Sequence, residues 1–533
     1  MQLTHGFARA AAMAVLMMGT SPMALMAETP ADTLVVADAI DDIVSIDPHE
    51  AFEFSGVDLN NNVYDTLVEL DPAKPGELVP GLAESWSVAD DGMTYTFKIK
   101  SGITFSSGNP LTAEDAAGSL RRVVKLNKTP AFIITQFGLT PENVDQMITF
   151  EGDTVTLKTD KAYAPSFVYN CLTAGVANIV DMKTVMEHEV DGDMGNAWLK
   201  ANSAGTGAYI LKSFKPNEGY VLEARQGHWR GDAKIKNVFM QHIPEGATER
   251  LLLEKGDIDI AREMTPTDIE GIAGNADLKV QGDVGGQVYY LALNQKKAEL
   301  ANPKVQEAMR WAIDYTGMQD SILKGQWVVH QDFLPLGFLG ALDENPYSLD
   351  IEKAKALMAE SGLTLPVDIG FTVRNNQERL DIATSIQNTF SQIGINLVLD
   401  VGDGKQGLET YRGRKHDITL QTWGPDYPDP HTNASTFAMN PDNSDAANAT
   451  GYLAWRTAWD PGAELNAETA AAVEEKDSAK RAEMYGDIQR KVRDNSAFVL
   501  MFQQARQDAM RANVSGFYAG GATDSASYWT VTK

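Results

Sequence analysis

The sequence has very few of the residues and motifs on which common catalytic and metal sites are built. Cys171 is the one cysteine among 533 residues, which excludes an internal disulfide and any zinc or iron–sulfur site made of several cysteines. The eight histidines include no H-E-x-x-H pair, and no G-x-S-x-G elbow is present. We therefore expect no catalytic residues, metal or cofactor.

Basic residues are scarce relative to acidic ones. Lys and Arg number 45 against 73 Asp and Glu, which gives a net charge of −28. Such a chain repels the phosphates of nucleic acid, so nucleic acid is not an expected partner. The same negative excess suits the solvated surface of a soluble protein. A hydrophobic content of 43% indicates a folded chain, and its length predicts roughly two to four domains.

One glycine pattern could indicate a dinucleotide site. Gly402, Gly404 and Gly407 follow the predicted strand Asn396–Val401 as G-x-G-x-x-G, which can hold a pyrophosphate at a helix N-terminus. The acid that should end the next strand is out of place, because Asp417 begins that strand. We therefore do not expect a dinucleotide.

No hydrophobic run is long enough to cross a membrane, which takes about 20 apolar residues. Near the N-terminus, Arg9 precedes the apolar run Ala10–Met18, and the segment ends in ALMA at Ala27. This order predicts a signal peptide over residues 1–27, cleaved near Ala27. Because Cys171 lies far downstream, a lipoprotein is not expected. Export without disulfides indicates a bacterial periplasm.

Alternating and helical patterns follow one another along the rest of the chain. Period-two alternation predicts strands at Asp32–Ile40, Thr94–Lys100 and Asp153–Asp160. Thr112, with acids in the following turn, predicts the start of a helix. Further on, the order strand, helix, strand over 366–401 predicts a βαβ unit, whose strands are parallel when they share a sheet.

Several phrases of the sequence stand in the order found in one family. They are YDTLVELD at Tyr64–Asp71, the long stretch Leu78–Arg122, and then GTGAY, GHWRGDAKIKNV, LEKGDIDIA, NPKVQEAMRWAID and DIEKAKALMAESG. With these phrases the chain resembles the extracytoplasmic solute-binding proteins of the peptide/nickel class, family 5 of ABC importers. The resemblance covers nearly all of the mature chain.

The resemblance implies an α/β fold of the two-lobed periplasmic binding protein type, in its large three-subdomain class (type II), with mixed sheets and an interlobe hinge. Lobe I would comprise 28–60 and 201–290, with an extra subdomain at 61–200. Lobe II would comprise 291–499, and 500–533 would return to lobe I. Tyr290–Asn294 and Phe498–Phe502 are the stretches where the crossing strands fit.

The resemblance also implies a ligand site at the end of the strand in DITLQTWGPDYPDP, Asp417–Pro430. In the family's peptide binders, the acid of W-x-x-D pairs with the amino terminus of the ligand and the Trp packs beside it. The matching residues here are Asp426 and Trp423, and Tyr427 and His431 follow as further candidates. The residues alone leave open that Asp426 caps the loop and that Trp423 belongs to the core.

Four more candidates come from other parts of the chain. Arg374 matches a family position that holds the carboxyl end of dipeptides, and its alternative is a surface salt bridge with Glu378 or Asp381. In lobe I, His49 and Phe54 are expected to face the cleft, or else to serve packing. The expected cleft residues after GDIDIA are Arg262 and Glu263.

The resemblance implies a periplasmic receptor that captures a small peptide-like, zwitterionic or polyanionic solute and delivers it to the permease subunits of an ABC importer, and we expect a monomer. Other ligands of the family remain open, among them metal–chelate complexes, opines, sugars, haem and glutathione. An exported hydrolase would need a nucleophile that the sequence does not offer. A folding helper would need exposed apolar surface.

Overall fold

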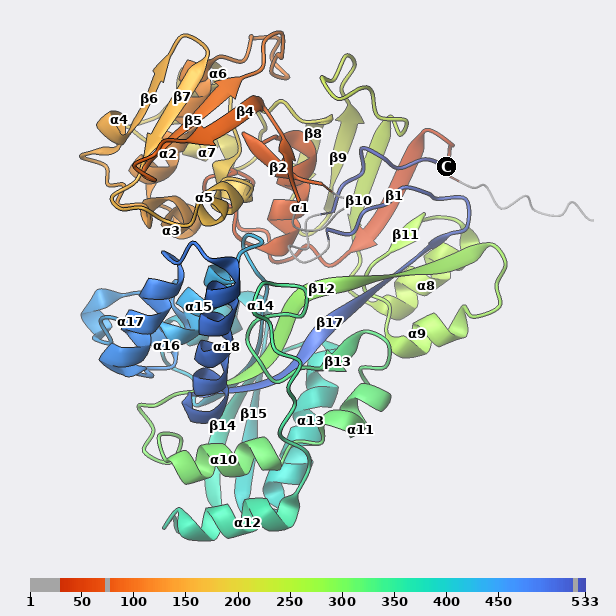
Figure 1. Ribbon diagram of the computed structural model, residues 1–533. Coiled ribbons are helices and arrows are strands. Elements are labelled where there is room, and N and C mark those ends of the chain that lie inside the picture. Colours follow the sequence, from red (N-terminus) through yellow and green to blue (C-terminus); the bar gives the residue numbers. More distant parts are fainter. Residues whose placement is uncertain (1–28, 72–76, 521–525) are drawn as a thin grey trace, which may run out of the picture.

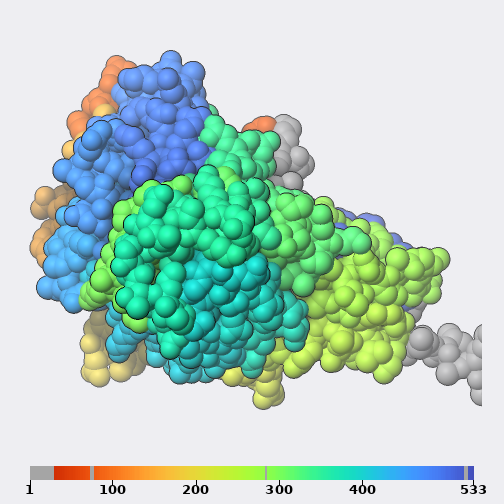
Figure 2. Space-filling view, turned by 90° about the horizontal axis from the view of Figure 1, so that it is seen from below, coloured from red at the N-terminus to blue at the C-terminus, as the bar shows by residue number. Residues whose placement is uncertain are grey.

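The computed structural model describes residues 29–71, 77–520 and 526–533, so the predicted signal peptide lies outside the described residues. The chain forms two lobes (Figure 1), of which lobe I carries an extra subdomain at one side. Lobe II lies below both and forms most of the face seen from below (Figure 2). In the part that the structure describes, no helix combines the length and apolarity that a membrane crossing requires.

Lobe I is built on one end of an 11-stranded mixed sheet. Strand β1 pairs in parallel with β10 and β11, and β9 and β8 continue the sheet in antiparallel order. Gly256 ends α8 with φ 80°, a left-handed conformation that favours glycine, as its place after LLLEK predicts. The elements are β1 (Thr33–Asp38), α1 (Phe54–Val63), β8 (Tyr209–Lys215), β9 (Gly219–Ala224), β10 (Asn237–His242), α8 (Gly246–Lys255), β11 (Ile260–Ala261) and α9 (Pro266–Gly271).

The extra subdomain has its own four-stranded antiparallel sheet, in the order β4-β5-β7-β6. Helix α2 covers it and begins with a capping box, in which the Thr112 side chain and Asp115 satisfy each other's backbone amides. Its elements are β2 (Val68–Leu70), β3 (Leu78–Pro80), β4 (Ala83–Val88), β5 (Thr94–Ile99), α2 (Ala113–Leu126), α3 (Phe132–Thr135), α4 (Val144–Met147), β6 (Ile148–Glu151), β7 (Thr154–Lys158), α5 (Pro165–Cys171), α6 (Met182–Glu187) and α7 (Asn196–Leu199), with 3-10 turns at Thr129–Ala131 and Gly175–Ala177.

Two long antiparallel strands connect the lobes. They are β12 (Leu278–Leu293) and β17 (Phe498–Arg511), which run diagonally from one lobe into the other (Figure 1). At one end β17 pairs with β11 of lobe I, and at the other end β12 pairs with β16 of lobe II. Of the two stretches at which the sequence predicts crossings, Phe498–Phe502 lies within β17, and Tyr290–Asn294 forms the end of β12 except for Asn294, which follows the strand.

Lobe II contains the predicted βαβ unit. Strands β14 and β15 are parallel and α13 connects them, as the sequence order predicts. The elements are α10 (Pro303–Trp311), α11 (Tyr315–Asp320), β13 (Trp327–Val329), α12 (Ile351–Glu360), β14 (Val367–Arg374), α13 (Gln377–Ser391), β15 (Ile395–Gly402), α14 (Gly404–Arg412), β16 (Ile418–Trp423), α15 (His431–Ala438), α16 (Leu453–Arg456), α17 (Gly462–Ala472) and α18 (Ser478–Asn495), with a 3-10 turn at Asp445–Ala447.

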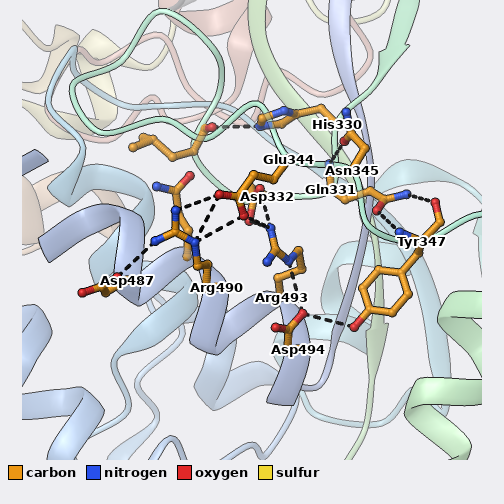
Figure 3. Close-up of polar contacts among 12 residues, drawn as sticks. His330, Gln331, Asp332, Glu344, Asn345, Tyr347, Asp487, Arg490, Arg493 and Asp494 are labelled. Atoms are coloured by element: carbon orange, nitrogen blue, oxygen red, sulfur yellow. Dashed lines mark hydrogen bonds and ion pairs between the residues drawn. The ribbon is translucent and has the colours of Figure 1, made fainter. Parts of the chain in front are cut away.

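A polar network holds the long connection between β13 and α12 against α18 (Figure 3). Arg493 lies 3.3 Å from the buried carboxylate of Asp332 and 3.1 Å from Glu344, which also accepts from Arg490. Burial raises the pKa of Asp332 to about 7. Since this network joins parts of lobe II to one another, we assign it a structural role.

Candidate functional site

A pocket lies where the loop after β16 meets α1 and the extra subdomain. Its walls are mainly apolar and include Phe52, Phe54, Ile133, Val176, Pro425 and Asp426. The space between them is about 570 Å³ with the part open to solvent, and the centre of a water molecule can reach about 70 Å³ of it. The accessible part is smaller than the roughly 300–1,000 Å³ of an ordinary small-molecule site, so this form of the protein leaves room for only a small group.

Asp426 is the charged residue among those that line this pocket. Its amide donates to the Thr432 hydroxyl at 3.1 Å, which fixes the backbone of the loop. Burial raises the pKa of the Asp426 carboxyl to about 7, against the opposing effects of Thr432 and of the positive charge of Arg456. Among the described residues no Lys, Arg or His forms an ion pair with it. Such a carboxylate is suited to receive a cation from a ligand.

Aromatic residues of both lobes close one side of the pocket. The ring of Trp423 lies 6.5 Å from that of Phe52, edge to face. Phe54 is 36% exposed and packs on Gly424, where an added Cβ would lie 2.8 Å from the Phe54 ring. The indole Nε1 of Trp423 is buried without a hydrogen-bond partner in the part of the chain described. Trp423 therefore belongs to the core and stands directly behind the pocket.

Tyr427 and His431 point away from the pocket. Tyr427 is buried in the core of the extra subdomain, with its ring 6.0 Å from that of Phe167. His431 packs edge-on against the same Phe167 at 5.3 Å, and its Nδ1 lies 3.2 Å from the Tyr485 hydroxyl. Burial lowers the pKa of His431 to about 3, so the ring is neutral. These two residues join lobe II to the extra subdomain.

The structure does not bring His49 to the pocket. Its Nδ1 accepts from Arg122 at 2.8 Å and its Nε2 lies 3.0 Å from the carbonyl oxygen of Asn178, which places the proton on Nε2. The side chain is fully buried, and burial lowers its pKa to about 4. The expectation that His49 faces the cleft is thus replaced by a packing role, because both ring nitrogens already have protein partners.

Arg262 and Glu263 also lie outside the residues that line the pocket. Arg262 is buried and paired with Asp38 at 2.8 Å and with Asp58. The pKa of Glu263 is raised to about 8 by burial and by the nearby carboxyls of Asp38 and Glu378. The two residues thus belong to a charge cluster within lobe I that reaches Glu378 of lobe II. Arg262 is therefore held away from the pocket by its ion pairs with Asp38 and Asp58.

Arg374 forms an ion pair across the lobes. Its Nη2 lies 2.9 Å from Asp41 of lobe I, whereas the sequence left Glu378 or Asp381 as the alternative partners. Both side chains are about one-third exposed, at 33% and 38%. The pair therefore stabilises contact between the lobes only weakly, since exposed pairs contribute about 0–1 kcal/mol.

Replacing this arginine tests its role. Arg374→Ala is expected to change the affinity for a bound solute by no more than about fivefold, the equivalent of about 1 kcal/mol. Isothermal titration calorimetry measures this change, and Asp41→Ala should produce the same small effect. A loss of about 100-fold or more that is confined to anionic solutes would instead place the ligand's acidic group on Arg374.

Sequence reasoning missed two arginines near the pocket, Arg412 and Arg456. The guanidinium group of Arg456 lies 5.9 Å from the centre of the Trp423 ring. Arg412 ends α14 and faces Glu53 of lobe I. No local motif marks either residue, because the groups around them come from distant parts of the chain, and neither residue is among those that line the pocket. In the described part of the chain no group of three or more His, Cys, Asp or Glu side chains could hold a metal ion.

Comparison with known proteins agrees with this architecture. Residues 77–445 match the family model described as bacterial extracellular solute-binding proteins, family 5 middle. The chain belongs to this family, whose members are binding proteins, and it has a substrate-binding role in ABC import.

Individual relatives cover nearly the whole chain. A probable D,D-dipeptide-binding periplasmic protein of Escherichia coli (strain K12) is 28% identical over 500 residues and 92% of each chain. The nickel-binding periplasmic protein of the same organism is 28% identical over 82% of this chain and 83% of its own. A periplasmic binding protein from Helicobacter pylori, solved with the peptide STSA, has a TM-score of 0.83 at 21% identity, over 94% of this chain and 98% of that chain.

Proposed function

We propose that this protein is the periplasmic receptor of an ABC importer for a small peptide-like zwitterion, and that the pocket at Asp426 holds the ligand's ammonium group. The observation that carries the proposal is the position of the Asp426 carboxyl, which lines a pocket between the two lobes beside Phe52 and Phe54 and has no ion-pair partner among the described residues. A protonated amine would supply the missing charge and the missing hydrogen bonds. The D,D-dipeptide specificity of one relative supports a ligand of this size.

The lobes would close over this ligand by bending β12 and β17. Two long strands shared by both lobes allow a hinge motion, while Phe52, Phe54 and the Arg374–Asp41 pair would separate on opening. Lobe I would then comprise 28–60, 201–290 and the return 500–533, with the extra subdomain at 61–200 and lobe II at 291–499. A closed, loaded receptor is the form that permease subunits would recognise.

The same proposal places the mature protein in the periplasm after removal of residues 1–27, as a monomer without catalytic activity, metal or cofactor. No residue of the pocket is a nucleophile beside a base. The cargo would be the peptide-like solute itself.

A thermal-shift screen of the refolded mature protein tests the proposal. The panel contains D-alanyl-D-alanine, L-dipeptides, opines, metal–chelate complexes and glutathione. A ligand at 100 times its dissociation constant stabilises the folded state by about 2.7 kcal/mol, which raises the melting temperature by several degrees. We expect a shift with a dipeptide. A shift with a metal–chelate complex alone would overturn the peptide-like assignment, and no shift at all would overturn the receptor assignment for this panel.

A further inference from the structure

Two arginines of lobe II lie near the pocket without a carboxylate partner. Arg456 is 3% exposed; its Nε donates to the carbonyl oxygen of Thr450 at 2.7 Å, and this is the one hydrogen bond of its side chain within the described ranges. Its guanidinium group lies 5.2 Å from the centre of the Tyr411 ring and 5.9 Å from that of Trp423. The Trp423 ring thus lies between the Arg456 guanidinium group and Phe52 of the pocket wall.

Arg412 is in a similar position. It ends α14, at the edge of lobe II that faces lobe I (Figure 1). Its Nε is buried and has no hydrogen-bond partner among the described residues, nor does any described acid form an ion pair with the side chain. Burial and the positive charge of Arg456 lower the pKa of Arg412 to about 10, and only Glu53 acts in the opposite direction.

This arrangement differs from that of three other buried arginines, whereas Arg310 is likewise buried without a carboxylate and donates instead to the carbonyl oxygens of Ser496 and Phe498. Arg122 is paired with Asp47, Arg481 with Asp429, and Arg493 with Asp332. A buried guanidinium without an anion is costly, and two such groups near each other add repulsion. Neither cost has a structural compensation in the described contacts of Arg412. A bound anion would remove both.

Charged groups of both lobes act on one another near Arg412 and Arg456. On lobe I, Glu53 lies between Phe52 and Phe54 of the pocket wall and faces Arg412 without contact. On lobe II, Arg456 acts electrostatically on both Asp426 and Arg412. An acidic group and a basic group of one small molecule could therefore each meet a partner of opposite charge.

We propose that Arg412 and Arg456 form an anion subsite of this pocket, so that the ligand is a short zwitterion with its ammonium group on Asp426 and its carboxylate on the two guanidinium groups. The inference rests on the proposed function, since it assigns a second group of the same ligand. The inference assigns the ligand's carboxylate to Arg412 and Arg456 and not to Arg374, which already has Asp41 as its partner. A guanidinium pair favours a planar carboxylate, which it can bind with two parallel hydrogen bonds.

The test compares three probes on the mature full-length protein by calorimetry: D-alanyl-D-alanine, its C-terminal amide and its N-acetyl derivative. The wild type is expected to bind the free dipeptide at least about 30-fold more tightly than the amide, because the amide leaves the guanidinium groups without a charge partner. Arg412→Met is expected to weaken the free dipeptide by about 30- to 100-fold and to leave the affinity for the amide unchanged. Arg490→Met, which removes an exposed arginine of α18, is the matched control and should bind like the wild type.

Two results would overturn the subsite while leaving the receptor intact: equal affinity of the wild type for dipeptide and amide, or an equal loss for both probes in Arg412→Met. If a ligand without any acidic group is the one that shifts the melt, the subsite is wrong as well. A failure of the receptor proposal would give a different result, because the wild type would then bind no compound of the panel.

The melting temperature of the ligand-free variant distinguishes a loss of ligand contacts from a folding defect. Because Arg412 has no carboxylate partner among the described residues, ligand-free Arg412→Met is expected to melt at or above the temperature of the wild type. A fall of several degrees would show that Arg412 stabilises the fold, and would overturn its assignment to the ligand.

Discussion

Asp426→Asn is expected to weaken the binding of an amine-bearing ligand by about 100-fold or more at pH 8. The substitution keeps the shape and the contact to Thr432 but removes the charge, and truncating one partner of a buried charge pair costs about 2–5 kcal/mol. Calorimetry with D-alanyl-D-alanine measures the loss. The N-acetyl dipeptide is the control, because it carries no ammonium group and should bind wild type and variant alike.

The pH dependence of the wild type follows from the same carboxyl. With its pKa raised to about 7 by burial, Asp426 is largely protonated at pH 6 and largely ionised at pH 8. Affinity for an amine that stays protonated over this range should therefore fall about tenfold from pH 8 to pH 6, because the ionised fraction of the carboxyl falls from about 90% to about 10%. Asp426→Asn should show a flat profile over this range. A profile of equal slope in the variant would place the titrating group elsewhere.

The same shift has an opposite effect on the ligand-free protein. A carboxyl whose pKa is higher in the folded than in the unfolded state binds more protons when folded. Its contribution to the free energy of unfolding is thus greatest below its unfolded value near 4 and is lost as the pH rises towards 7. At neutral pH the Asp426 carboxyl therefore no longer adds to the free energy of unfolding, as is typical of a binding residue whose charge partner is the ligand.

Arg122→Met is expected to lower the free energy of unfolding by about 3–5 kcal/mol, the usual cost of breaking a buried ion pair. Arg122 is fully buried and makes two hydrogen bonds to the carboxylate of Asp47, at 2.9 and 2.7 Å. It also donates to the carbonyl oxygen of Met194 and to His49. Burial acts to raise the pKa of Asp47, but Arg122 holds it below its ordinary value, so the variant leaves a buried charge without its cation.

Urea unfolding at neutral pH measures this loss. Lys125→Met on the same helix is the matched control, because Lys125 pairs with the exposed Asp145 and such pairs contribute about 0–1 kcal/mol. A loss below about 1 kcal/mol in Arg122→Met would mean that solvent or another cation satisfies Asp47. That result would also reopen a ligand role for His49, whose tautomer depends on Arg122.

Local signals in the sequence were sufficient for most elements of the fold. The capping box at Thr112, the left-handed Gly256 and the parallel β14-α13-β15 unit all depend on residues within a few positions of one another. Such contacts repeat wherever the same residues occur, so their patterns can be recognised without a structure. The family phrases added the two-lobed α/β architecture, which the structure and the family match confirm.

The sequence by itself also indicated the residue on which the proposed site is centred. Asp426 follows Trp423 and β16 by three positions, so the strand end determines where the carboxylate emerges. What the sequence could not determine is which charged groups meet. Arg374 pairs with Asp41, which is 333 residues away in the sequence, and His49 contacts Arg122, which is 73 residues away.

Only the tertiary structure decided which arginines remain without a partner. Arg122 and Arg412 carry the same side chain, but one is enclosed with Asp47 and the other faces the cleft with no acid in contact. Because Coulomb interactions depend on distance and burial in space, a residue's neighbours in sequence say little about them. Local patterns therefore predicted the helices and strands of this protein, whereas the charged groups proposed to bind its ligand could be named only from the tertiary structure, which brings distant segments together.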